Sequence, residues 1–515
     1  MKQTALAAAV GLIVMIMAAT VFAPALDNDF VNLDDDLYVV QNASITSIDA
    51  PFFSWAFSTY YAYNYHPLTW ISHAVDYRLW GLNPRGHHAT SILLHCINAF
   101  LVVLLVWRLL ENAAPSAAAG SGRLYFLMTA GFTGAVFAIH PLRVESVVWV
   151  SERKDVLCVT FFLLSLLSYL NYAAGRGGRG SYAASVVFFL LAALSKPMAI
   201  SLPVVLLLLD LYPLGRLTAA AGARRLRVVA VEKLPFIAIG AGLAFLTIAA
   251  QRTSGQVRPL SVLSLGDRTI TALRELSFYI EKLFIPSRLA PFYPLTSPVS
   301  LTFPDLVRIA CLAAFTILCF ILWRRAKVFL IAWLFYVITA FPTLGIVQVG
   351  GQAGADRYTY LPLLGPSLLV SLLATAMFQR LQRAPRNLRP LAMAFLIVCA
   401  LAGVGMADAT RSQIGVWRDS IALWSREIAI FPYNVSVSYV NRARAYAKAG
   451  DHTSAVRDYT TSILMEPDDY RSVAARGVSY LAEGDRTAAC ADFEKALRLS
   501  PRYYLAVFYQ ERSCK

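Results

Sequence analysis

Three consecutive aspartates, Asp34, Asp35 and Asp36, follow the first apolar stretch of the chain by about ten residues. Carboxylates this close to a membrane-crossing segment are costly to bring into lipid, so they must face water, a cation or a polar substrate at the bilayer surface. A run of like charges is also the usual form of a solvated loop. The residues alone therefore leave two interpretations open, a reaction centre at the membrane surface or an exposed acidic loop.

The elements that position these acids follow from composition. The chain has 515 residues, of which 57% are hydrophobic and 15% charged, and these proportions are typical of a polytopic membrane protein. The formal net charge of +15 would indicate nucleic acid binding in a soluble chain. In a membrane protein it is attributed to basic loops that set topology, and no nucleic acid partner is predicted.

Apolar runs long enough to cross a hydrocarbon core of about 30 Å predict about eleven membrane helices. They begin near residues 4, 89, 124, 156, 181, 198, 234, 304, 327, 361 and 389. Residues 268–287 are also apolar but hold four charged side chains, so we expect an interfacial amphipathic helix there. Residues 1–25 resemble a signal peptide, although an uncleaved first span is favoured because the apolar stretch is long.

Basic residues set the predicted orientation, with the N-terminus in the cytoplasm and the C-terminal domain outside. The clusters assigned to the inner face contain Arg108, Arg123, Arg176, Arg179, Arg216, Arg224, Arg225, Arg227, Lys233, Arg324, Arg325 and Lys327. The outer loops of the membrane domain, residues 1–408, are then 24–88, 140–155, 251–303 and 346–360.

Acids and bases gather on this outer face. Besides the aspartates, the candidate residues are His66, His140, Glu145, Arg153, Asp155, Lys196, Arg357 and Tyr358. Such a set suits a substrate with an anionic head and a lipid tail. Arginine and lysine grip a phosphate through charge-assisted hydrogen bonds, and a carboxylate takes a proton from an attacking hydroxyl.

An internal repeat occupies residues 409–515. Seven positions recur after 34 residues, among them the Gly450-Asp451 and Gly484-Asp485 pairs, and 34 residues is the tetratricopeptide period. We predict full repeats at about 434–467 and 468–501, a half-repeat at 417–433 and a terminal helix at 502–515. Cys490 and Cys514 fall in this domain, and whether they pair is left open.

Several motifs together resemble the transmembrane and tetratricopeptide repeat-containing (TMTC) family and its bacterial relatives. They are NLDDDLYVVQN, YHPLTW, GLNPRGHH, FAIHPLRVESVVWVSERKDVL, LSKPMA and ADRYTYLP, in this order along the chain. That family is similar to GT-C glycosyltransferases of the protein O-mannosyltransferase type. The resemblance implies an all-α polytopic fold of GT-C type with a C-terminal tetratricopeptide solenoid.

The resemblance also implies site residues. Asp34 and Asp35 match the family's acidic pair, with Asp35 predicted as general base and Asp34 in support, although the two roles are exchangeable. Glu145 matches the acid of the second-loop motif and is expected to orient acceptor or sugar. Arg153, Lys196 and Arg357 match basic positions expected to hold the departing lipid phosphate. Arg143 departs from the family, which usually has histidine there.

The implied reaction moves a hexose such as mannose from a polyprenyl-phosphate sugar to a hydroxyl, with inversion. The expected acceptor is Ser or Thr of an exported protein that the repeats present, and the expected location is a bacterial inner membrane with periplasmic repeats. Two alternatives are open, transfer to an envelope glycan or lipid and a non-catalytic scaffold that recruits proteins through its repeats. The lipid-linked donor is the one cofactor-like molecule expected, and the metal dependence is left open. A divalent metal is not favoured, because no spacing of the histidines enforces metal geometry.

Overall fold

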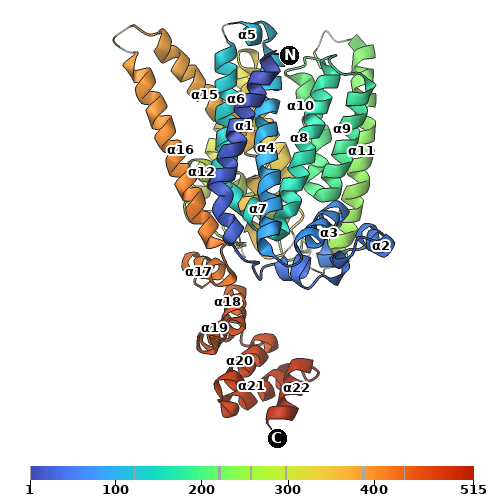
Figure 1. Cartoon of the computed structure of the whole chain (residues 1–515), viewed down its shortest axis with the longest axis vertical. Helices are drawn as coiled ribbons and strands as arrows, with labels where there is room; N and C mark the ends of the chain where they lie inside the picture. The colour runs from blue at the N-terminus through green and yellow to red at the C-terminus, as the bar shows by residue number, and fades with distance from the viewer. Residues whose placement is uncertain are drawn as a thin grey trace.

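The computed structural model describes residues 2–120, 122–218, 222–253, 255, 258–295, 299–348, 350–385, 387, 389–433 and 435–514. Residue 434, where the first predicted repeat begins, lies outside these ranges. A bundle of long helices forms one body, and a string of shorter helices extends from one of its ends (Figure 1). The N-terminus lies at the opposite end of the bundle from the C-terminus.

The eleven predicted apolar spans each coincide with a helix. The bundle helices are α1 (Lys2–Phe22), α4 (Pro84–Ala113), α6 (Arg123–Ile139), α8 (Arg153–Ala173), α9 (Arg179–Ser195), α10 (Leu202–Leu211), α11 (Gly222–Thr253), α13 (Phe303–Ile321), α14 (Lys327–Ala340), α15 (Leu364–Arg383) and α16 (Pro390–Val416). Within the described residues, seven are long and apolar enough to cross a membrane. An eighth qualifies if α6 and the following segment Pro141–Val148 are counted as one span. Three shorter apolar helices, Arg179–Ser195, Pro197–Leu211 and Lys327–Thr343, account for the remaining predicted spans. The predicted all-α membrane fold is confirmed.

Close approach of α6 to its neighbours holds the centre of the bundle together. A Cβ atom on Gly134 would lie 2.4 Å from Val103 of α4 and 3.4 Å from Val14 of α1, so only glycine fits this position. The first helix therefore packs inside the bundle, where Ala7, Val14 and Ala18 are buried.

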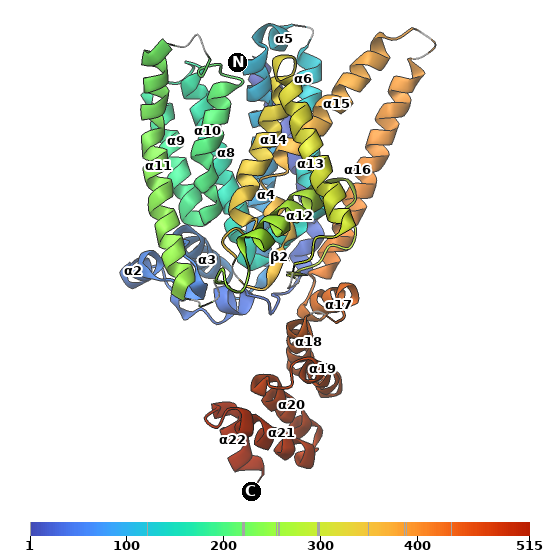
Figure 2. The same cartoon turned by 180° about the vertical axis from the view of Figure 1, so that it is seen from behind.

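Helix connections at the two ends differ in character. The links from α8 to α9 and from α15 to α16 lie at the N-terminal end, as the predicted path requires (Figures 1 and 2). Two basic residues assigned to that end form ion pairs with acids. Arg216 pairs with Asp210 at 2.9 Å and with Glu232 at 2.7 Å, and Lys233 pairs with Asp210 at 2.6 Å.

Short elements cover the other end of the bundle. They are η1 (Ala23–Asp27), η2 (Asp36–Val40), η3 (Ala43–Thr46), α2 (Ala50–Ser58), η4 (Tyr61–Tyr63), α3 (Pro67–Trp80), η5 (Pro141–Arg143), α7 (Val144–Val148), η6 (Val150–Glu152), η7 (Pro197–Ser201), η9 (Phe341–Thr343) and η10 (Asp356–Thr359). Strands β1 (Tyr293–Pro294) and β2 (Gln352–Gly354) pair antiparallel. The remaining connections, α5 (Pro115–Ala119) and η8 (Leu322–Arg324), link bundle helices.

The charged segment at 268–287 forms α12 (Leu265–Phe284), which is not among the candidate membrane spans. Ser264 caps it by accepting a hydrogen bond from the Asp267 amide, and the Asp267 carboxylate accepts one from the Ser264 amide, which fixes where the helix begins. The helix lies across the bundle near the end that carries the repeats (Figure 2). It contacts α13 and β2.

The C-terminal solenoid contains α17 (Ser420–Ile430), α18 (Ser436–Lys448), α19 (His452–Met465), α20 (Tyr470–Glu483), α21 (Arg486–Leu499) and α22 (Tyr504–Ser513). The 34-residue period recurs in the backbone conformation of two glycines and in two ion pairs of the solenoid. Gly450 and Gly484 adopt φ of 85° and 86°, which suits glycine, and each ends a helix. Arg442 pairs with Asp458 at 2.7 Å, and the same pair recurs as Arg476 and Asp492, also at 2.7 Å.

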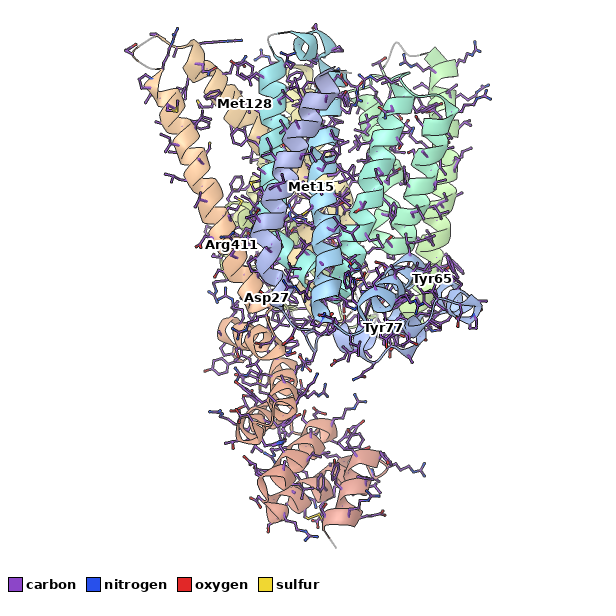
Figure 3. All side chains as sticks on the ribbon, in the orientation of Figure 1. Met15, Asp27, Tyr65, Tyr77, Met128 and Arg411 are labelled. Carbon is purple, nitrogen blue, oxygen red and sulfur yellow. A yellow bond between two sulfur atoms is a disulfide. The ribbon has the colours of Figure 1, made fainter. Side chains whose placement is uncertain are left out.

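A disulfide closes the far end of the solenoid. Cys490 of α21 is bonded to Cys514, which follows α22. Figure 3 shows the yellow sulfur bond near the C-terminus, and it shows Asp27 and Arg411 at the repeat end of the bundle while Met128 lies toward the other end. The disulfide settles the question that the cysteine pattern left open.

Candidate functional site

Four segments that are distant in the sequence meet at the end of the bundle from which the solenoid extends. They are the loop around Asp34, the stretch from α7 into α8, the residue after α9, and η10. The segment Pro141–Val148, which contains η5 and α7, follows α6 at an angle of 58° to it. This bend turns residues 144–155 across the end of the bundle, so that the four segments face one another.

Glu152 is the centre of an ion network at this meeting point. Its carboxylate lies 3.0 Å from Lys154 Nζ, 3.0 Å from Lys196 Nζ and 3.4 Å from Arg357 Nε. Two other acids flank it. Asp155 accepts from Lys196 at 2.5 Å, and Glu145 accepts from both the side chain and the amide of Arg357.

Aromatic rings shape the walls around the cations. Lys154 Nζ lies 4.6 Å from the centre of the Tyr38 ring, and the Arg357 guanidinium lies 5.3 Å from Trp149 and 4.9 Å from Tyr358. Cations over ring faces gain an attraction that grows as water is excluded. These rings therefore help to hold Lys154 and Arg357 in place.

The two predicted catalytic aspartates differ sharply in their surroundings. Asp35 is 1% exposed, and its carboxylate accepts three hydrogen bonds, from the amide of Val31 at 3.0 Å, the amide of Ser151 at 2.9 Å and the hydroxyl of Ser151 at 2.5 Å. Asp34 is only partly buried, and its carboxylate makes no hydrogen bond to any residue that the structure describes. Asp35 thus ties the first loop to residue 151, and Asp34 is left open to a substrate.

Charge around Asp34 matches a proton-accepting role. Burial raises the pKa of Asp34, and nearby Lys154 lowers it in opposition. A carboxylate whose pKa is raised is a stronger base than a solvated one once it is ionised. Burial raises the pKa of Asp35 as well, so the two aspartates differ in their hydrogen bonds and not in the direction of their pKa shifts. Asp35 accepts three hydrogen bonds, and the Asp34 carboxylate accepts none from the residues that the structure describes.

Asp35 should make stability depend on pH in a defined direction. Burial raises the pKa of Asp35 from 3.8 to about 6, so the folded state holds this proton more tightly than the unfolded state. The contribution of Asp35 to the free energy of unfolding is greatest below the pKa that Asp35 has in the unfolded chain. That contribution is lost as pH rises through the pKa of Asp35 in the folded state.

We expect Asp35→Asn to remove this dependence. Between about pH 4 and pH 7, the wild type should lose about 2 to 3 kcal/mol relative to the variant. Thermal or denaturant unfolding in detergent at several pH values measures this difference. A difference that does not change with pH would contradict the assignment.

Arg153 was predicted to hold the lipid phosphate, but the structure places it among protein partners. Its guanidinium is fully buried and pairs with Asp76 at 2.7 Å. It also donates to Ser91 Oγ at 2.8 Å and to the carbonyl of His87 at 2.6 Å. Arg153 therefore joins α3 and α4 to the start of α8 and has no face turned to a substrate.

The two predicted histidines also separate. His140 is fully buried; its Nδ1 accepts from the Leu142 amide at 3.2 Å, so its Nε2 donates to the Leu283 carbonyl at 3.0 Å. It shapes the bend after α6 instead of contacting substrate. The His66 ring packs at a tilt against Trp70, with ring centres 4.6 Å apart, and its buried Nε2 has no hydrogen-bond partner among the described residues. Burial, with Lys154 nearby, lowers the pKa of His66 well below its usual range, so its ring is neutral.

Reasoning from the sequence gave no site role to three residues of this site. Glu152 and Lys154 belong to the SERKD motif, where four consecutive charged residues beside a membrane span were a usable signal. Arg143 donates from Nη1 to the carbonyls of Thr359 at 2.8 Å and Tyr360 at 3.0 Å. It thereby fixes η10, which carries Arg357, and only the tertiary contact reveals this role.

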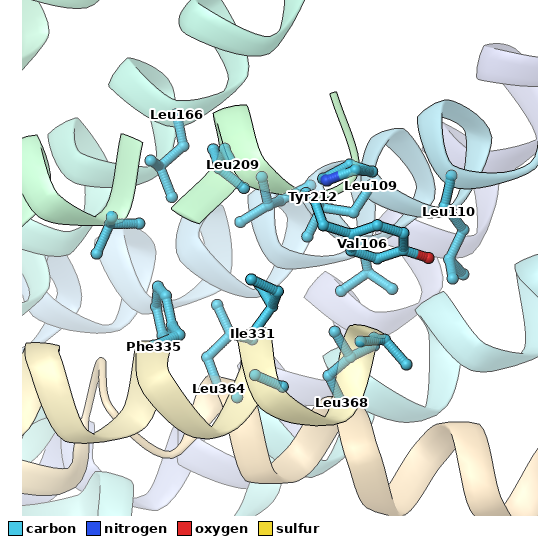
Figure 4. A pocket seen from close by; sticks show the side chains of 17 residues that line it. Val106, Leu109, Leu110, Leu166, Leu209, Tyr212, Ile331, Phe335, Leu364 and Leu368 are labelled. Atoms are coloured by element: carbon cyan, nitrogen blue, oxygen red, sulfur yellow. The ribbon is translucent and has the colours of Figure 1, made fainter. Parts of the chain in front are cut away.

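Two apolar hollows lie elsewhere in the bundle. One, of about 80 Å³, is lined by α4, α10, α14 and α15 and includes Leu109, Leu209, Ile331 and Leu368 (Figure 4). Its lining comes from the parts of α4 and α14 farthest from the ion network. The other, of about 560 Å³, lies among α12, α13, α14 and α15, with Glu281 and Arg308 among its lining residues.

Metal ligands do not gather in the described part of the chain. No three His, Cys, Asp or Glu side chains in it are placed to hold one ion.

Comparisons with known proteins place these observations in context. The tetratricopeptide repeat family model matches residues 437–469 and 470–503. Two solved structures align over most of the chain, each with a TM-score of 0.39. They are the oligosaccharyltransferase of Archaeoglobus fulgidus, 14% identical over 78% of this chain and 56% of that one, and ArnT from Cupriavidus metallidurans bound to undecaprenyl phosphate, 15% identical over 94% and 79%.

Curated relatives share stretches of the sequence. Protein O-mannosyl-transferase Tmtc1 of Drosophila melanogaster is 31% identical over 30% of this chain and 16% of its own length. Protein O-mannosyl-transferase TMTC4 of Mus musculus is 29% identical over 42% and 31%, and the Homo sapiens TMTC4 is 31% identical over 34% and 24%. The matches thus span less than a third of the length of each of these relatives. The resemblance predicted from the motifs is confirmed: this chain is similar to protein O-mannosyl-transferases of the TMTC family.

Proposed function

We propose that this protein is a membrane glycosyltransferase of GT-C type, which moves a sugar from a polyprenyl-phosphate donor to a hydroxyl acceptor with inversion. One observation carries the proposal. The open carboxylate of Asp34 lies in the field of Lys154, Glu152 and Arg357, so a base and a set of phosphate-binding cations share one site. The names of the curated relatives favour mannose as the sugar.

The chemistry is a single displacement. Asp34 takes the proton of the acceptor hydroxyl, whose oxygen attacks the anomeric carbon from the face opposite the phosphate. The bond from that carbon to the phosphate oxygen breaks, and its electron pair leaves with the lipid phosphate. Lys154, Lys196 and Arg357 stabilise the charge on the leaving group.

These cations have capacity for a phosphate although they already pair with acids. An ammonium group has three N–H donors, and Lys196 uses one each for Glu152 and Asp155. The side chains of Lys154, Lys196 and Arg357 keep 10%, 13% and 10% exposure, enough for a ligand to reach them. A phosphate would accept hydrogen bonds from the remaining N–H groups. When no phosphate is bound, the acids balance the positive charge of the three cations.

The larger apolar groove suits the lipid part of the donor. It lies among α12 to α15 and is lined by Ile280, Phe315, Leu369 and other apolar side chains. Helix α12, one wall of the groove, also contacts β2, which is followed directly by η10 and Arg357. A polyprenyl chain in the groove would therefore approach the cations along the protein surface.

The acceptor is proposed to be Ser or Thr of an exported protein that the solenoid presents. The solenoid extends from the same end of the bundle as the ion network (Figure 1). Grooves of tetratricopeptide solenoids form extended binding surfaces. In this proposal the protein lies in a bacterial inner membrane, with the N-terminus in the cytoplasm and both site and repeats on the periplasmic side.

Transfer assays with purified protein test the function. The donors are a panel of polyprenyl-phosphate hexoses, and the acceptors are a Ser/Thr-rich peptide, the same peptide with Ala in place of Ser and Thr, and a small soluble alcohol. We expect transfer from one donor to the hydroxyl-bearing peptide and none to the Ala peptide. Failure with every donor would contradict the proposal, and a preference for the small alcohol would point to a glycan or lipid acceptor.

A further inference from the structure

The loop that carries Asp34 is bonded to the C-terminal domain. The amide of Asn32 donates to Ser420 Oγ at 2.9 Å, and its side chain accepts from Trp424 Nε1 at 2.7 Å. The same side chain donates to the carbonyl of Asn441 at 2.8 Å. All of these partners lie in α17 and α18, more than 380 residues away in the sequence. Asp34 follows Asn32 by two residues, so its backbone position depends on this attachment.

The same helix, α17, is also connected to the segment that carries Arg357. Glu427 accepts from the Phe292 amide at 3.1 Å, and the next residue, Tyr293, donates its hydroxyl proton to Asp356 at 2.8 Å. Asp356 precedes Arg357, which reaches the ion network. Burial raises the pKa of Glu427 to about 8, and Glu427 is fully buried.

A third contact connects the residues just before α17 to the ion network. Trp417, just before α17, stacks on Trp149 with ring centres 5.6 Å apart. Trp149 is the ring beneath the Arg357 guanidinium. Trp424 and Glu427 are three residues apart and so lie on one face of α17, which is turned toward the site.

We propose that residues 417–431 are a positioning element of the reaction centre, and that through Asn32 and Asp356 they set the separation between Asp34 and the cation network. The inference rests on the proposed function, because it concerns the geometry of that reaction. The half-repeat would then position the reaction centre in addition to covering the end of the solenoid. The C-terminal domain is then a part of the site and not a detachable module for presenting the acceptor.

The key variant is Trp424→Phe in the full-length protein. Phenylalanine keeps an aromatic ring at this fully buried position and removes the N–H that Asn32 accepts, together with part of the indole ring system. Losing one buried hydrogen bond should make local opening of the Asp34 loop about five- to tenfold more frequent. Trp323→Phe is the control for shortening a tryptophan elsewhere, since Trp323 is half-buried and lies in η8, away from the site.

Two readouts are measured on each variant. Hydrogen exchange of peptides covering residues 26–37 should become about five- to tenfold faster in Trp424→Phe and stay unchanged in Trp323→Phe. The kcat of sugar transfer should fall by a similar factor, while KM for the donor stays within about twofold, because donor contacts are intact. In a double-mutant cycle, Asn32→Ala and Trp424→Phe should be less than additive, because both remove the same bond.

The outcomes are separable. Unchanged exchange at residues 26–37 would overturn the inference and leave the proposed function standing. Faster exchange with unchanged kcat would also overturn it, since the loop would then be held for stability alone. Absence of transfer in the wild type contradicts the proposed function, and the inference about that reaction falls with it, whereas the exchange measurement still tells whether α17 holds the loop.

Discussion

Asp34→Asn is expected to abolish most sugar transfer, lowering kcat by about 10² to 10⁴-fold, the usual contribution of a general base. The amide is nearly the same size as the carboxylate but cannot accept the proton of the acceptor hydroxyl. Because the Asp34 side chain makes no hydrogen bond within the described structure and burial disfavours its charge, the variant should fold and should be no less stable than the wild type. Steady-state kinetics and thermal unfolding of the same preparation measure both expectations.

The neighbouring aspartates supply the controls for this experiment. Asp36→Asn should change kcat by no more than about twofold, because Asp36 begins η2 and is not held against the ion network. In the wild type, kcat/KM should rise with pH through the raised pKa of Asp34, and this limb should disappear in Asp34→Asn. Wild-type activity in Asp34→Asn together with inactive, folded Asp35→Asn would return the role of base to Asp35.

Glu152→Gln is expected to have the largest effect on stability. The substitution removes the one charge that contacts Lys154, Lys196 and Arg357 together, while preserving the shape of the side chain. Breaking a buried ion pair by removing one partner costs about 3 to 5 kcal/mol, because the remaining charges stay buried without compensation. The free energy of unfolding in detergent should fall by about this amount, and transfer activity should fall with it.

An acid at the opposite end of the bundle provides a matched control. Glu111 also pairs with two cations, Arg108 at 2.8 Å and Arg176 at 3.1 Å, but its side chain is 16% exposed, compared with 3% for Glu152. Pairs near solvent contribute about 0 to 1 kcal/mol, so Glu111→Gln should be nearly neutral. Equal losses in the two variants would show that the central network has no special role in stability.

The features that the sequence predicted correctly depend on local composition or on a short period. The eleven spans follow from apolar runs, and each is found as a helix. The repeat follows from a 34-residue spacing, and the Gly450 and Gly484 helix ends repeat at that spacing. Charges within α12 excluded it as a span for the same local reason.

The sequence predicted which residues lie on the same face of the membrane domain, but not which of them contact one another. Topology alone brings the loops of Asp34, Glu145, Lys196 and Arg357 to one face, because helices that cross a bilayer can place their connections on only two sides. Nothing in the spacing tells that Arg153 faces Asp76 or that Glu152 is the centre of the network. Those facts depend on how α3, α4 and α8 pack.

By itself, therefore, the sequence determined the apolar helices, the repeat and the side of the bundle on which the ionisable residues gather. The tertiary structure decided which of them are used. Asp34 and Asp35 are adjacent and chemically identical, and they differ because Ser151, 116 residues away, and Val31 both donate to Asp35. The attachment of Asn32 to Trp424 spans 392 residues. Contacts of this range are fixed by packing of the whole chain, since local sequence specifies the conformation of a segment but not the segment that it meets.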